Sequence, residues 1–287
     1  MVDFADRLEV ARERDEPVAK AATFFEGELV TEVLFDPNGW TRDQRDLRVQ
    51  LLAALTRIPN WDADQESSDL EGQGAVVNGM IVSPAPSIRW THFRCLSGVA
   101  TACLPLKCAG RQGLCDVTVD GVPNKLWFVT DDADHVAFFR DAIDVERCDE
   151  AALERIAPSA FPNLAWVEGV WQGLRDFSRP YIAVRGEVVR HLSVLSDHGR
   201  DIFAGPRTEI ASRFGSLGIA ISPENGKTLS NAKCMVARTR LFRGERVQFV
   251  WHTKLLPHVD RIHVHEGTSG SGGKIIVGIM RDHLPLP

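Results

Sequence analysis

The sequence predicts an α+β protein: a helical N-terminal segment, a mixed sheet, a helical middle part, and C-terminal helices packed on a curved antiparallel sheet. Two patterns predict this, apolar residues at helical spacing in some segments and strict polar–apolar alternation in others. The composition, 44% apolar and 25% charged, is typical of a soluble globular protein. A length of 287 residues allows two domains. We expect an acidic α+β domain over residues 1–160 and helices followed by a basic antiparallel-sheet domain over residues 161–287.

The first part of the chain carries helical patterns. Apolar residues at helical spacing predict helices over residues 3–14 and 16–30. Thr41 and Gln44 form a capping box ahead of a third helix. The polar and acidic residues 60–73 then predict a surface loop.

From residue 74 the pattern changes to strands. Asp120-Gly121 is typical of the tight turn of a hairpin, and Asp131 and Asp132 predict the cap of a following helix. Residues 158–163, which hold two prolines, predict a link. The predicted elements are strands over 75–82, 87–93, 114–119 and 125–130, and helices over 132–144 and 149–157.

Four cysteines lie close together in this region and raise the question of zinc. Their separations are not the tight pairs in which two thiolates grip one ion. We therefore expect free thiols that pack as small apolar groups, and zinc binding stays open. The four are Cys95, Cys103, Cys108 and Cys115.

The ends of the chain differ in charge. The first residues are typical of an acidic amphipathic helix and lack the features of a signal peptide, and no apolar run approaches the ~20 residues of a membrane helix. We expect a cytoplasmic protein without membrane contact. Residues 1–200 hold 21 Lys+Arg against 32 Asp+Glu, whereas residues 201–287 hold 12 against 7. A basic C-terminal third on an acidic body is typical of a local anion site, and equally of a solvated sheet face.

The middle of the chain predicts the helices that precede the last sheet. Pro180 is typical of the first turn of a helix that runs to about residue 197, with His191 on its flank and Gly199 at its end. A shorter helix is expected between Phe203 and Phe214, and the final sheet is expected to begin within residues 217–222.

Two alternating runs near the C-terminus bring ionisable groups together. In the second run Ile262 and Val264 leave one face of a strand while Arg261 and the two neighbouring histidines leave the other. The run over 246–254 alternates in the same way, with Val247, Phe249 and Trp251 on one side. Paired as a hairpin, the two runs gather five groups on one face, which we predict to be open to solvent. These are His252, Lys254, Arg261, His263 and His265.

Two helices followed by a strand and basic antiparallel strands make residues 180–287 similar to the small RelE-type endoribonuclease toxins. The resemblance implies a sheet whose concave face cuts RNA with basic residues and without a metal or cofactor. On the matching strands, the family's basic cleavage groups would correspond to Arg246, His252, Lys254, Arg261, His263, His265, Arg281 and His283. The long acidic N-terminal part departs from the family, whose members are short and basic throughout.

The same residues permit RNA cleavage through the 2′-hydroxyl. That reaction needs a base, an acid and positive charge at the phosphate, and imidazole is suited to both proton roles near neutral pH. We expect His252 or His263 as the base and His265 or His283 as the acid. Phosphate clamps are expected at Lys254, Arg261 and Arg281, and further nucleic-acid contacts at Arg246.

Two other functions remain open at this point. His263 and His265 on one strand face, with His252 across the ladder, resemble a three-imidazole metal site, although no supporting carboxylate is identifiable. The basic face could instead dock a partner protein or a second copy of the chain, because any sheet with one solvated side alternates in this way.

Overall fold

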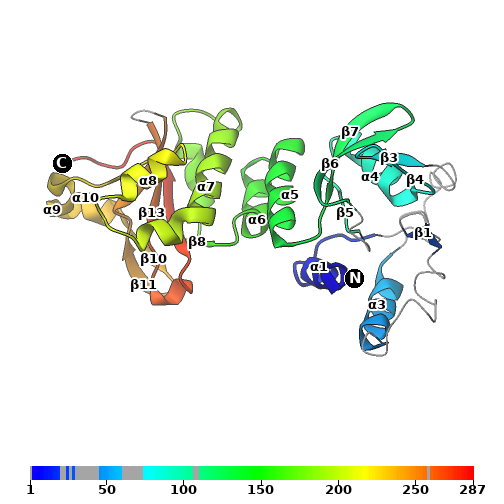
Figure 1. The fold of residues 1–287 in the computed structure, drawn as a ribbon. Helices are drawn as coiled ribbons and strands as arrows, with labels where there is room; N and C mark the ends of the chain where they lie inside the picture. Colours follow the sequence, from blue (N-terminus) through cyan, green and yellow to red (C-terminus); the bar gives the residue numbers. More distant parts are fainter. Residues whose placement is uncertain are drawn as a thin grey trace. The chain divides into compact units, whose positions relative to one another are not determined.

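A computed structural model describes residues 2–19, 24–25, 28–29, 45–59, 74–105, 110–256 and 259–287. The chain divides into two compact units, Met1–Glu146 and Arg147–Pro287. Figure 1 shows helices and separate sheets, which confirms the α+β fold class. The basic sheet lies wholly in the second unit, and the predicted domains 1–160 and 161–287 stay a prediction.

The N-terminal segment of the first unit is helical only in part. Helices α1 (Val2–Glu13) and α3 (Arg45–Arg57) confirm two predictions. The helix predicted over 16–30 is wrong, because β1 (Phe24–Phe25) pairs antiparallel with β2 (Glu28–Leu29) there. Aromatic residues favour strands. The predicted capping box at 41–44 and the loop over 60–73 lie outside the described residues.

The first five-stranded sheet has the order β4-β3-β6-β7-β5. The strand predicted over 75–82 is a hairpin, because Asn78 and Gly79 both adopt positive φ. The strand predicted over 87–93 is wrong, since α4 covers it with Pro86 at the first turn. The predicted turn at residues 120–121 is confirmed. The elements are β3 (Ala75–Val77), β4 (Met80–Val82), α4 (Pro86–Leu96), β5 (Ala102–Cys103), β6 (Gly113–Val119), β7 (Val122–Phe128) and α5 (Asp132–Val145).

The cysteines of this unit behave as packing groups. Cys115 is buried in the apolar core of the sheet, and Cys95 and Cys103 pack against that core. Each thiol contacts a different oxygen, on Gln112, Thr101 and Thr91 respectively. Cys108 lies outside the described residues, and the other three form no metal-binding group within the part that the structure describes.

The second unit holds a mixed sheet of order β8-β14-β13-β12-β9, in which β8 runs parallel to β14 and the other pairs are antiparallel. Its elements are α6 (Glu150–Ala160), β8 (Leu164–Trp166), η3 (Val170–Asp176), α7 (Tyr181–Phe203), α8 (Ile210–Ser216), β9 (Ala220–Pro223), α9 (Gly226–Ser230), α10 (Ala232–Ala237), β10 (Thr239–Phe242), β11 (Glu245–Gln248), β12 (Trp251–Leu256), β13 (Val259–His265), η4 (Ser269–Ser271) and β14 (Ile275–Arg281).

Helix α7 passes the glycine predicted to end it. A Cβ added at Gly199 would lie 2.9 Å from Ile275 Cγ1, so the missing side chain lets the helix approach β14 closely. The helix therefore continues to Phe203, whose ring packs against Trp251 of β12 with centroids 5.6 Å apart. Among the described residues, no helix has an apolar stretch long enough to cross a membrane.

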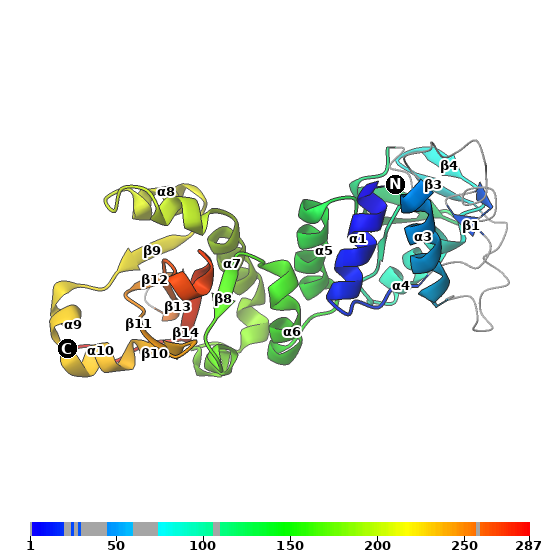
Figure 2. The same cartoon turned by 90° about the horizontal axis from the view of Figure 1, so that it is seen from below.

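The two faces of this sheet are covered by different layers. Figure 2 shows α7 on one side of the strands and α9 and α10 on the other. The β10–β11 hairpin also covers part of the second face, where Phe242 and Val247 join an apolar cluster with Ile276 and Ile279 of β14. The single strand predicted over 246–254 is therefore wrong: the chain leaves β11 at Gln248 and enters another sheet at Trp251.

Candidate functional site

The ionisable residues lie on one face of β12, β13 and β14, in two neighbouring rows. His252 pairs with His263, and Ile279 follows on β14. The other row, which we call the cation row, consists of Lys254, Arg261 and Arg281. Lys254 pairs with Arg261, and Arg261 pairs with Arg281. Opposed side chains, and those two positions apart along a strand, share a face, so the predicted grouping of His252, His263, Lys254 and Arg261 agrees with the register.

The histidine pair is buried, contrary to the open face expected from the sequence. His252 is 5% exposed and His263 is 0% exposed. Their face carries Ile279 and Ile276, which pack against Phe242, Val247 and Phe249. Because these groups exclude solvent, His252 and His263 are poorly placed to exchange protons with a dissolved substrate.

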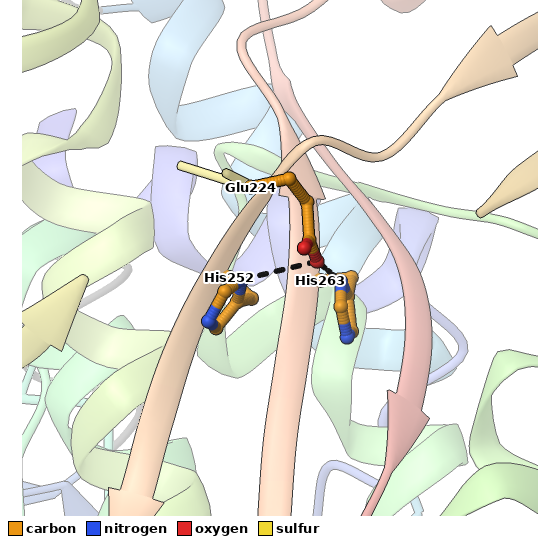
Figure 3. Close-up of side chains that lie close together, drawn as sticks. All are labelled: Glu224, His252 and His263. Carbon is orange, nitrogen blue, oxygen red and sulfur yellow. Dashed lines mark ion pairs between the residues drawn. The ribbon is translucent and has the colours of Figure 1, made fainter. Parts of the chain in front are cut away.

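Two residues that the sequence did not single out complete the buried cluster. Glu224 follows β9, and its Oε1 lies 3.5 Å from His252 Nδ1 and 3.9 Å from His263 Nδ1 (Figure 3). Arg238, which is fully buried between α10 and β10, places its Nε 2.8 Å from the same oxygen. No motif marks Glu224, because its position depends on β9 pairing with β12 thirty residues later in the chain.

Burial and charge set the protonation of this cluster. Burial raises the pKa of Glu224, but hydrogen bonds from His252 and Arg238 outweigh it and lower the pKa to about 2. Burial lowers the pKa of His263 to about 3, and the nearby His252 lowers it further. Burial likewise lowers the pKa of His252, against the opposing effect of Glu224. At neutral pH the cluster therefore holds a carboxylate and two neutral imidazoles.

Several polar atoms of the cluster lack a hydrogen-bond partner. They include Nδ1 and Nε2 of His263, Nδ1 of His252 and Oε1 of Glu224, each of them buried. Nε2 of His252 does have a partner, the Ser222 hydroxyl at 3.3 Å. Leaving a buried polar atom without a partner costs ~1–3 kcal/mol, so this concentration of such atoms requires an explanation.

The cation row reaches solvent. Lys254 and Arg261 are half-buried and Arg281 is exposed. Arg281 Nε lies 3.5 Å from Asp176 Oδ2, and Arg261 Nη2 lies 3.3 Å from Nε2 of the exposed His283. Like charges placed directly opposite in a sheet are destabilising, so three cations in register favour a bound anion.

Neighbouring groups reinforce this positive field. Burial lowers the pKa of Arg261, and the Arg238 guanidinium also lowers it, while Glu224 and Asp282 oppose the change. Burial, and then the charge of Arg281, lower the pKa of Arg240. Lys254 has no ion pair within the described ranges of the chain.

The other predicted site residues stand apart from both rows. His265 is half-buried, accepts the Gly267 N–H at Nδ1 at 3.0 Å and lies against the Phe249 ring. Burial lowers the pKa of His265, although Glu266 and Glu245 oppose this. Arg246 is exposed on β11, in the small hairpin sheet. The structure thus brings His283 to the cation row and leaves Arg246 away from that sheet.

No family model, curated protein or solved structure matches this chain. The function is therefore argued from the site alone.

Proposed function

We propose that the second unit binds RNA through the cation row and cleaves it at His283. The observation that carries the proposal is the in-register pairing of Lys254, Arg261 and Arg281 across three adjacent strands, at the open part of the sheet face. Arg and Lys bind phosphate oxygens through charge-assisted hydrogen bonds, and Arg does so bidentately. Successive phosphates of a single strand could then contact successive cations of the row.

The chemistry follows from the partner of His283. A guanidinium has only donors, so Arg261 donates to Nε2 of His283 and that nitrogen carries no proton in this arrangement. An unprotonated imidazole nitrogen suits a base that takes the 2′-hydroxyl proton, whereas the sequence placed His283 as the acid. In the proposed reaction Arg261 and Arg281 stabilise the anionic phosphorane, and Lys254 donates a proton to the leaving 5′-oxygen.

Binding of a fluorescent single-stranded RNA tests the row. Arg261→Ala should weaken binding at least tenfold, because a hydrogen bond to a charged group contributes about 1.5–3 kcal/mol. Arg246→Ala, which removes an arginine from the separate hairpin sheet, should bind within twofold of the unaltered chain. The logarithm of the affinity should fall with the logarithm of salt at a slope of about −2, given three phosphate contacts and about −0.7 for each.

Cleavage is tested separately with His283→Ala, which should bind RNA but leave it intact. Equal RNA affinity in Arg261→Ala and the unaltered chain would contradict the proposal, as would the absence of RNA binding. Salt-insensitive self-association without RNA binding would favour the predicted protein-interaction role instead.

A further inference from the structure

The buried cluster beside the cation row supplies the ligand set of a metal ion. A nitrogen from each of His252 and His263 and a carboxylate oxygen of Glu224 lie within 4.8 Å of one another, and this is the one such group within the described parts of the chain. We propose that these three side chains bind a divalent transition-metal ion of the zinc class. This inference goes beyond RNA binding, since neither the cation row nor His283 depends on it.

The distances fit a small adjustment of the side chains. Zinc binds imidazole nitrogen and carboxylate oxygen at about 2.0–2.2 Å, which places two tetrahedral ligand atoms about 3.3 Å apart. The Glu224 oxygen lies 3.5 Å and 3.9 Å from the two Nδ1 atoms. Figure 3 shows the carboxylate pointing between the two rings. Small rotations about the side-chain bonds bring all three atoms within reach of one ion.

The unpartnered atoms distinguish this cluster from an ordinary buried ion pair. His263 is completely buried, and neither of its ring nitrogens has a hydrogen-bond partner in the described residues. His135 of the first unit is also buried, but its Nε2 lies 2.9 Å from Glu16 Oε2, so one carboxylate serves one imidazole. Glu224 faces two imidazoles, and a metal ion would give one atom of each a partner.

Surrounding groups hold the ligands in orientation. The Ser222 hydroxyl contacts His252 Nε2, which leaves Nδ1 directed at Glu224. Arg238 fixes the Glu224 carboxylate and is itself anchored by its Nη1, which donates to the carbonyl oxygens of Cys234 and Pro285. Hydrogen-bonded partners of this kind are regular features around metal ligands.

Arg238 also bears on the fourth ligand. Its positive charge offsets that of the Glu224 carboxylate, so two neutral imidazoles would leave the charge of the ion uncompensated in a buried site. An anionic fourth ligand such as hydroxide satisfies that charge. The site would join β9, β12 and β13 through its ligands and the segment before β10 through Arg238, beneath the apolar layer of the hairpin.

The metal content of the purified full chain tests the inference. After exposure to zinc and removal of free ion, we expect one zinc per chain by elemental analysis. His263→Ala and His252→Ala should hold less than a tenth of that, and Glu224→Gln should lower zinc affinity at least tenfold. His191→Ala removes another buried histidine, in α7, and should keep the full zinc content. His265→Ala should also keep it, which separates this ligand set from the three-imidazole site predicted from the sequence.

Cobalt binding to the unaltered chain gives a measurement that does not depend on variants folding. Tetrahedral coordination by nitrogen and oxygen should produce visible cobalt absorption bands that zinc displaces. An unaltered chain that takes up neither zinc nor cobalt overturns the inference, as does zinc retained by His263→Ala. RNA affinity measured on the same zinc-free and zinc-loaded samples keeps this outcome distinct from the outcome for the cation row.

Discussion

Two parts of one sheet face, two residues apart along β12 and β13, have opposite environments. His252 and His263 lie under the β10–β11 hairpin and its apolar cluster, whereas Lys254 and Arg261 continue the same face into solvent. The strand pattern is the same in both places. The difference shows that the layer above a sheet, rather than the alternation within it, decides whether a polar residue becomes a buried ligand or a surface contact.

The cover has direct consequences for the chemistry of each part. Burial lowers the pKa of His263 to about 3, so it stays neutral at physiological pH and is suited to metal binding. His283 is exposed beside Arg261, where it can meet a substrate. The two kinds of histidine therefore belong to different proposed functions.

Removing a central group of the cover should have the largest effect. Phe249 is fully buried, and its ring occupies the space above Gly278, where a Cβ would lie 2.2 Å from ring atoms. Phe249→Ala should lower the free energy of unfolding by about 3–5 kcal/mol, through lost burial and the cavity left behind. Denaturant unfolding of the full chain measures this change.

The matched control for that variant lies on the same hairpin. Leu241 is 64% exposed on β10, so Leu241→Ala should change the free energy of unfolding by less than about 0.5 kcal/mol. Similar losses in the two variants would contradict the assignment of Phe249 to the cover.

Acid should destabilise the metal-free chain through the covered histidines. Burial, reinforced by the charge of neighbouring His252, lowers the pKa of His263 from 6.5 to about 3. The unfolded chain therefore binds a proton at higher pH than the folded chain. Stability is complete above pH 6.5 and is lost as the pH falls towards 3, by an amount of the order of 3 kcal/mol.

A variant without the titrating ring checks this effect. His263→Gln keeps a polar group of similar size but does not titrate, so its free energy of unfolding should change less between pH 7 and pH 4 than that of the unaltered chain. Identical pH dependence in the two proteins would show that His263 is not protected from protonation by its cover.

The sequence predicted the register of the site better than its surroundings. Alternation placed His252, His263, Lys254 and Arg261 on one face, because a two-residue period is a local property of strands. It could not show that residues 245–248 leave the sheet and fold back with β10, since that depends on packing against Ile276 and Ile279. Glu224 and Arg238 were missed for the same reason, as long-range pairing alone brings them to the histidines.

Errors in the rest of the fold have similar causes. The helix α4 was predicted as a strand because Ile88, Trp90 and Phe93 have high strand propensity, while Pro86 favours a helix start. Gly199 was predicted to end α7, yet it serves close packing against Ile275. In both cases tertiary contacts and terminal residues outweighed local propensity.

The different environments of the two parts of the sheet face can be measured directly by deuterium exchange at the C2 position of each imidazole, followed by mass spectrometry of the full chain. The structure predicts rapid exchange at His283 and exchange at least tenfold slower at His252 and His263. Equal rates at all three rings would contradict a covered histidine pair beside an open cation row.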